Sequence, residues 1–286
     1  MIFTQYSDID TFGADVLETL LENEAQNSLP ISFINNKTAY KSNWFLASVK
    51  NDAGGVVLTA ACTPPYNIVM YETRNHPNND AVKLLANELI SAGIILPGVL
   101  SEQGLALRFA EAYAGHIGYQ NHMSQIIMRL DKINEIERAP GRYRVLCEDD
   151  LFFIPYWELA FSEECEIEVF DIKTYVEHVK MRLGKDTHYI WEDGRPVSQA
   201  HRARGTPNGT AISGVYTPPH YRGKGYASSV VSELSKMILA QGKYSFLHAD
   251  ASNPISCSIY RRLGYYDLCV FDEICFTHVQ QQIKGR

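Results

Sequence analysis

The segment from residue 215 to 227 reads Val215-Tyr216-Thr217-Pro218-Pro219-His220-Tyr221-Arg222-Gly223-Lys224-Gly225-Tyr226-Ala227. This order is typical of a buried strand end, a proline-stiffened turn, a glycine-rich bend and the first turn of a helix. Such a helix start points several unpaired backbone N–H groups at one spot, where the positive end of the helix dipole favours an anion. Gly223 and Gly225 can adopt positive φ, while Arg222 and Lys224 add charge. The segment predicts a phosphate-binding turn; a plain strand-to-helix turn with two solvated cations is the alternative.

The elements around this turn follow from local patterns. Apolar spacing predicts a helix from Tyr226 to Gln241, and Asn253-Pro254 supplies the N-cap and first residue of the next one. Asp193-Gly194 predicts a hairpin turn. The strands that we expect are 188–192, 196–201, 210–217, 244–249 and 268–276, and two or three helical segments are expected within 143–183.

The first half of the chain shows the same order of elements. A helix within 8–27, strands at 44–49, 55–62 and 67–71, and helices at 80–92 and 103–116 are expected. A short apolar run at 94–100 takes the strand position between the two helices, and 123–130 is expected to be the closing strand. We therefore predict two domains of similar fold, residues 1–138 and 139–286. Each is expected to be α/β (α+β), with a mixed, mostly antiparallel sheet flanked by helices. The strand-to-helix turn 73–79 of the first half contains no glycine, so the first domain is expected to lack the phosphate-binding turn.

Composition limits the class of protein. The 286 residues carry a formal net charge of −7, which argues against general nucleic-acid binding. The six cysteines form no C-x-x-C pair, and neither a signal peptide nor an 18-residue apolar run is visible. We expect a cytoplasmic protein with reduced thiols and no membrane segment; its oligomeric state cannot be read from the sequence.

The sequence lacks the motifs of several other kinds of active site. Gly223-Lys224 is followed by glycine rather than Ser or Thr, so a P-loop is not formed, and no Gly-x-Ser-x-Gly elbow occurs. The nine histidines show neither His-x-x-x-His nor His-x-His spacing, so no metal site is expected.

The glycine turn resembles the acyl-CoA signature of the GNAT N-acetyltransferase superfamily, Arg/Gln-x-x-Gly-x-Gly/Ala, with Arg222, Gly225 and Ala227 at its defined positions. A second match follows about 30 residues later. Residues 250–265 resemble the next strand and helix of that superfamily, with Asn253 and Tyr260 seven residues apart. The resemblance covers about 142–280; the first half shares only the element order, as a degenerate GNAT-like copy that would shape the acceptor cleft.

The resemblance implies an N-acetyltransferase that moves an acetyl group from acetyl-CoA to a primary amine of a small molecule or peptide. A backbone N–H near Tyr216 would stabilise the oxyanion, and Tyr260 would protonate the leaving thiolate. An extended pantetheine could pair with Val215–Thr217. The implied cofactor contacts are Val215, Tyr216, Thr217, Arg222, Gly223, Lys224, Gly225, Tyr226, Ala227, Ser228 and Asn253.

A purely structural role would also explain several of these residues. Tyr260 fits an ordinary amphipathic helix, and Asn253 before proline is a good N-cap whatever the ligand. The aromatics at 157 and 161 could line an acceptor pocket or belong to a core stripe.

A protonated acceptor amine also needs a base, for which Glu158, His201, His248 and Asp250 are candidates. We name Glu158 with Tyr260 as the catalytic pair. Transfer of another acyl group, or a catalytically silent acyl-CoA sensor or interaction module, are the alternatives.

Overall fold

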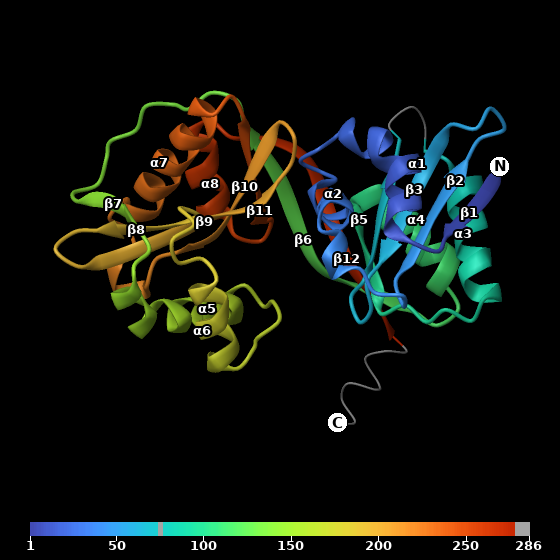
Figure 1. The fold of residues 1–286 in the computed structure, drawn as a ribbon, viewed down its shortest axis with the longest axis horizontal. Coiled ribbons are helices and arrows are strands. Elements are labelled where there is room, and N and C mark those ends of the chain that lie inside the picture. Colours follow the sequence, from blue (N-terminus) through green and yellow to red (C-terminus); the bar gives the residue numbers. More distant parts are fainter. Residues whose placement is uncertain (74–76, 278–286) are drawn as a thin grey trace. The chain divides into compact units, whose positions relative to one another are not determined.

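The computed structural model describes residues 1–73 and 77–277, so part of the glycine-free turn of the first half lies outside the described residues. The chain forms two compact units (Figure 1). The first contains Met1–Ile127 together with the segment that begins at Leu268, and the second contains Met128–Asp267. No helix in the described residues is both long and apolar enough to span a bilayer.

The first unit is a mixed sheet with helices on both faces. Its elements are β1 (Ile2–Tyr6), α1 (Ile9–Leu21), α2 (Ser28–Asn35), β2 (Phe45–Lys50), β3 (Val56–Cys62), β4 (Ile68–Glu72), α3 (Asn79–Ser91), β5 (Gly98–Glu102), α4 (Gln103–Ala114) and most of β6 (Tyr119–Leu130). The strand order is β1-β2-β3-β4-β5-β12-β6. Strands β1 to β4 pair antiparallel, and β4 and β5 pair parallel.

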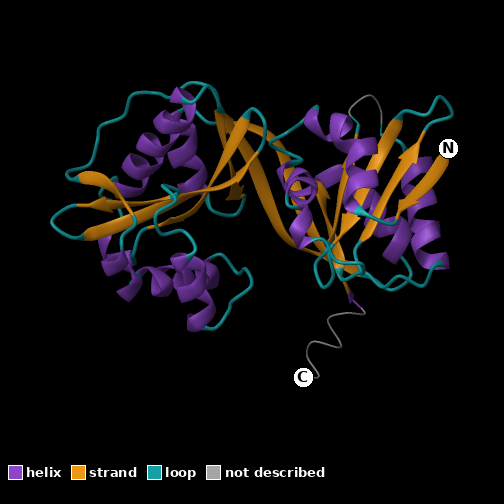
Figure 2. Ribbon diagram, in the orientation of Figure 1, coloured by secondary structure: helices purple, strands orange, loops and turns teal. Residues whose placement is uncertain are grey.

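Alternation along β2 explains why both faces are covered. Ala47 and Val49 are buried with the inner residues of α3 and α4, whereas Leu46 is buried with those of α1 and α2. Successive side chains of a strand point to opposite faces, so an apolar run such as this one needs a helical layer on each side. Figure 2 shows helices on the two sides of the strands.

The second unit repeats this order of elements. They are β7 (Arg142–Val145), α5 (Ile154–Glu164), α6 (Ile172–Lys180), β8 (His188–Glu192), β9 (Pro196–Gly205), β10 (Gly209–Tyr216), α7 (Tyr226–Ala240), β11 (Tyr244–Asp250), α8 (Pro254–Leu263) and the start of β12 (Tyr266–Phe276). The strands follow the order β11-β10-β9-β8-β7, with the end of β6 beside β11. Strands β7 to β10 pair antiparallel, and β10 and β11 pair parallel.

The expected fold class is confirmed, and the long helices and most strands lie where the pattern predicts them. Three short elements, β1, α2 and β7, were not predicted. The division into units also differs from the expected boundary at 138/139, because β12 pairs antiparallel with β5, from Phe271 opposite Glu102 to Cys275 opposite Gly98. The last strand of the second copy thus completes the sheet of the first unit.

Candidate active site

The predicted phosphate-binding turn joins β10 to α7 in the second unit. A short 3-10 helix, Pro219–Tyr221, follows the strand, and the chain then passes through Gly223 at φ +77° and Gly225 at φ +79°. Gly225 is the N-cap of α7 and is left-handed, a conformation that costs other residues energy. A Cβ on Gly223 would meet no atom within 4 Å, so the turn is open on that side.

The amides of this turn make no hydrogen bond to the part of the chain that the structure describes. Among the described residues, none of the six N–H groups from Gly223 to Ser228 donates to another protein atom. The first amide that does so is that of Ser229, which donates to the Gly225 carbonyl at 3.0 Å. Residues 222–225 are exposed. The turn therefore offers a group of unsatisfied donors at the positive end of a 15-residue helix.

Side chains behind the turn hold its shape. The hydroxyl of buried Tyr226 donates to Asp193 Oδ2 at 2.6 Å, and this hydrogen bond raises the pKa of the tyrosine. The amide of Ala139 donates to Ser229 Oγ at 2.9 Å. Tyr226 thus contributes its backbone N–H to the turn, while its side chain supports α7 from behind.

Arg222 makes contacts that the sequence did not predict. Its Nε donates to the Thr217 carbonyl at 2.8 Å, and its Nη2 contacts both carboxylate oxygens of Glu164, at 2.6 and 2.8 Å. The Tyr216 hydroxyl also donates to Glu164, at 3.3 Å. Arg222 therefore ties the start of the turn to the end of α5, and Lys224 is the exposed cation that remains beside the open amides.

Strands β10 and β11 separate just before the turn. They pair only at Gly209, Thr210 and Ala211, opposite residues 244–246. Beyond that point β10 pairs with β9 alone, with a register shift between Ser213 and Tyr216. Gly214 lies in this bulge at φ +60°, and a Cβ there would sit 2.4 Å from His201 Nε2. The bulge thus requires glycine, and the edge of β10 that faces β11 is unpaired from Ile212 onward.

The end of β10 is fixed from its other side. Ser198 Oγ lies 3.1 Å from the Tyr216 carbonyl and 2.8 Å from Thr217 Oγ1. These contacts hold the backbone of the three residues predicted to bind pantetheine while leaving the β11 side of the strand unpaired.

Tyr260 lies on the inner face of α8. Its side chain is buried, and its hydroxyl makes no hydrogen bond to another described residue. Burial raises the pKa of this phenol, with smaller contributions from Tyr265, Cys165 and Cys257. Tyr260 is therefore a neutral proton carrier at physiological pH. Asn253 caps the same helix, since its Oδ1 accepts from the Ser256 amide at 3.0 Å, as its cap role predicts.

Glu158 lies on the buried face of α5, and no sequence pattern indicates its partners. Its Oε1 accepts hydrogen bonds from Arg182 Nη1 at 3.0 Å and from Gln199 Nε2 at 3.1 Å. Arg182 follows α6 and Gln199 lies on β9, so three separate elements meet at one carboxylate oxygen. No motif spans these positions; the available signal was the presence of polar residues where a core-facing strand usually carries apolar ones.

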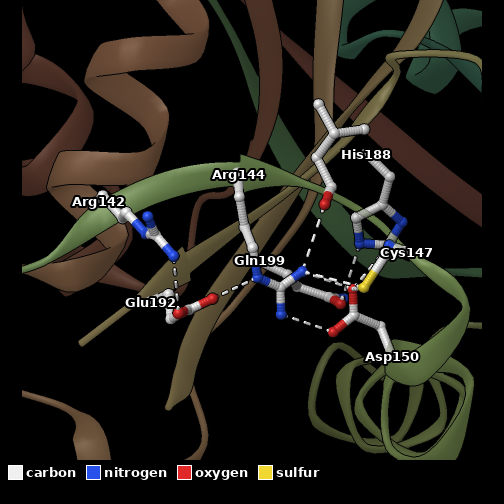
Figure 3. A network of polar contacts seen from close by, with 8 residues as sticks. Arg142, Arg144, Cys147, Asp150, His188, Glu192 and Gln199 are labelled. Carbon is white, nitrogen blue, oxygen red and sulfur yellow. Dashed lines mark hydrogen bonds and ion pairs between the residues drawn. The ribbon is translucent and has the colours of Figure 1, made fainter. Parts of the chain in front are cut away.

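A second polar network lies at the edge strand of this unit (Figure 3). Arg144 of β7 donates to Asp150 through Nη1 and Nη2, at 2.6 and 2.7 Å, and its Nε contacts Glu192 of β8. Asp150 is 1% exposed. Burial opposes its ionisation, but the Arg144 hydrogen bonds and the Cys147 amide outweigh burial and lower the pKa of the carboxyl. This network anchors β7 and the segment that leads into α5.

The remaining predicted residues lie in ordinary surroundings. Trp157 packs against Phe153 and beside the core residues around Ile154. This packing favours a place in the hydrophobic core, rather than in an acceptor pocket, for Trp157. Asp250 accepts from the Ser252 amide and hydroxyl, both at 2.8 Å. His248 lies on the part of β11 beyond its pairing with β10.

Comparison with known proteins supports the resemblance seen in the sequence. Residues 195–274 match the family model described as FR47-like protein. No curated protein matches the chain. Solved structures match over almost the whole chain, at low sequence identity.

Three of these structures illustrate the likeness. A GNAT-family acetyltransferase from Colwellia psychrerythraea shares 10% identity at a TM-score of 0.63, with 97% of this chain and 100% of that one covered. A GCN5-related N-acetyltransferase from Sphaerobacter thermophilus shares 15% at 0.68, covering 95% and 94%. A tandem GNAT protein from the clavulanic acid biosynthesis pathway shares 11% identity at a TM-score of 0.57, with 96% of this chain and 97% of that one covered. The family model thus matches residues 195–274, and the solved structures show that the chain shares the fold of GNAT proteins.

Proposed function

We propose that this protein is an acetyl-CoA-dependent N-acetyltransferase, and that its second unit binds the cosubstrate and transfers the acetyl group to a primary amine. The observation that carries this proposal is the run of six amides from Gly223 to Ser228 at the start of α7, none of which donates to a residue within 1–73 or 77–277. Proteins bind phosphate groups at such positions, and CoA carries a diphosphate. Lys224 would add charge beside it.

The separated strands would hold the rest of the cosubstrate. The edge of β10 that faces β11 is unpaired near Val215–Thr217, and an amide-rich pantetheine arm can hydrogen-bond to it as an added strand does. The bulge at Gly214 changes the direction of the following amides, and we assign the Tyr216 N–H as the donor to the carbonyl oxygen on which negative charge develops.

The reaction would proceed by direct attack. The acceptor nitrogen forms a bond to the thioester carbonyl carbon, the carbon–sulfur bond breaks, and the electron pair leaves with sulfur. Tyr260 gives its hydroxyl proton to the thiolate, and the proton lost by the acceptor nitrogen passes to a base. Glu158 would contact that nitrogen.

Thioester consumption tests the proposal. The assay would use acetyl-CoA with spermidine, phenethylamine, free lysine and a lysine-containing tripeptide, and calorimetry would measure CoA binding. Tyr260→Phe should lower kcat by about 100-fold and leave the affinity for CoA unchanged, because only the proton donor is lost. Tyr266→Phe is the matched control, since that exposed tyrosine bonds to Asp131, which is not among the predicted site residues.

Two outcomes contradict the proposal. Binding of CoA without turnover of any amine would support an acyl-CoA sensor instead of an enzyme. The absence of measurable affinity for acetyl-CoA and CoA would contradict both functions.

A further inference from the structure

Four side chains of the second unit form a closed ring of hydrogen bonds. Arg182 Nη1 contacts Glu158 Oε1 at 3.0 Å and His188 Nδ1 at 3.4 Å. His188 Nε2 lies 3.2 Å from Gln199 Oε1, a contact that Figure 3 shows, and Gln199 Nε2 returns to Glu158 Oε1 at 3.1 Å. The ring joins α5, the turn after α6, β8 and β9.

The direction of every bond in the ring is fixed by chemistry. A guanidinium can only donate, so His188 Nδ1 must accept from Arg182 and the histidine proton must be on Nε2. That proton is donated to Gln199 Oε1, and the amide NH₂ of Gln199 therefore points at Glu158. Burial, with a smaller effect of His201, lowers the pKa of His188 to about 3, so the imidazole is neutral near pH 7.

The ring occupies only one oxygen of Glu158. Both donors contact Oε1, and no other described residue donates to Oε2. The Glu158 side chain is 11% exposed, and those of His188 and Gln199 are fully buried. A carboxylate has about four acceptor positions. Glu158 is thus held through one oxygen from inside the fold, while the other is available to a ligand.

We propose that His188 and Gln199 are positioning residues, which with Arg182 hold Glu158 so that its Oε2 accepts a hydrogen bond from the acceptor nitrogen. The proposal rests on the proposed function. It narrows the role of Glu158 from proton acceptor to hydrogen-bond acceptor, because Arg182 and Gln199 already hold one oxygen of the carboxylate. Glu158 therefore orients the nitrogen and selects acceptors that carry N–H groups, and the proton released in the reaction passes to another base or to water.

The ring itself can be tested without any substrate. In protein labelled with ¹⁵N-histidine, long-range ¹H–¹⁵N NMR distinguishes the two neutral tautomers. His188 should be in the Nε2–H form from pH 5 to 8, and Arg182→Met should weaken the preference, because Arg182 is the donor that makes Nδ1 the acceptor. A His188 in the Nδ1–H form or a protonated His188 in that range overturns the ring.

Kinetics then test what the ring does. With the amine that gives the highest turnover in the panel above, Gln199→Met should raise the KM for that amine by about 10-fold to 100-fold, because a small displacement of an orienting group is costly. The Kd for acetyl-CoA should not change. Ser162→Ala is the control, since Ser162 is buried on the same face of α5 but lies outside the ring.

The result identifies which proposal fails. An unchanged KM in Gln199→Met, with the Nε2–H tautomer observed in wild type, overturns the positioning role alone. No turnover of any amine by the wild type overturns the proposed function and the acceptor role of Glu158 together.

Discussion

The two units share one order of elements but treat the strand-to-helix turn differently. In the second unit the turn before α7 presents open amides. In the first unit, Glu72 at the end of β4 accepts from the Asn78 amide at 2.6 Å, and Asn78 caps α3 through the Ala81 amide at 3.0 Å. Arg108 binds the same Glu72. A carboxylate of the chain itself thus occupies the helix start where an anionic ligand would bind.

The second helix after the turn, α8 in one unit and α4 in the other, also differs between the units. At the same offset from the N-cap, α8 carries Tyr260 and α4 carries Phe109. Phe109 is fully buried and stacks on Tyr113. The parallel strands differ as well, since Ser101 Oγ of β5 donates to the Met70 carbonyl of β4 at 3.0 Å and bridges the two strands. The same order of elements therefore frames an open turn in the second unit and a turn occupied by the chain's own side chains in the first.

The largest effect is expected from a charge placed in the open turn. Gly225→Glu should weaken CoA binding by on the order of 100-fold to 1000-fold, because it adds a like charge beside the diphosphate and forces a side chain into left-handed backbone. Isothermal titration calorimetry would measure this change.

The control for that variant is in the first unit. Gly93→Glu introduces the same residue at another open, left-handed glycine, at φ +65° and with no atom within 4 Å of its Cβ. It should leave CoA binding unchanged, with one site per chain. Normal CoA affinity in Gly225→Glu, or two sites in the wild type, would show that the two turns do not differ in function.

The glycine turn could be recognised from sequence because its information is local. Positive φ at Gly223 and Gly225, the N-cap at Asn253 and the helical spacing of α7 all depend on residues near in the chain. The pairing of β12 with β5 could not be foreseen, since both strands were recognised but no local pattern names a partner strand some 170 residues away.

The same limit applies to the site. Glu158 and Tyr260 could be selected by residue type and motif, whereas Arg182 and Gln199 are brought to Glu158 only by the fold. The Arg222–Glu164 ion pair is a similar case, because a charged residue at the end of a helix predicts no particular partner.

An intermediate effect, on the free energy of unfolding, is expected from substitutions in an ion pair of each unit. Asp150 is 1% exposed and bound to Arg144, whereas the Asp15 side chain is 29% exposed and bound to Lys50. Asp150→Asn should lower the free energy of unfolding by about 2–3 kcal/mol, because it removes one charge of a buried pair. Asp15→Asn should cost at most about 1 kcal/mol, since solvent screens that pair.

Acidity should distinguish Asp150→Asn from the wild type. The pKa of Asp150 is lowered in the folded protein, so its contribution to stability is present above its unfolded pKa and is lost as pH falls through the folded value. Urea unfolding at pH 7 and near pH 3 should show that Asp150→Asn is less sensitive to this fall in pH than wild type. If the free energy of unfolding fell equally in the two proteins between pH 7 and pH 3, Asp150 would not contribute to the pH dependence of stability.

The smallest effect concerns the bridge between the parallel strands of the first unit. Ser101→Ala removes the hydrogen bond to Met70 and should lower the free energy of unfolding by about 1 kcal/mol, because Ser101 is fully buried and the Met70 carbonyl loses a donor. It should not create a second CoA site, since Glu72 still occupies the start of α3. Calorimetry with CoA would compare Ser101→Ala with the double variant that also carries Glu72→Gln. Binding to the first unit of the double variant alone would show that Glu72 excludes the anion. Binding to the single variant would show that the Ser101–Met70 hydrogen bond excludes it.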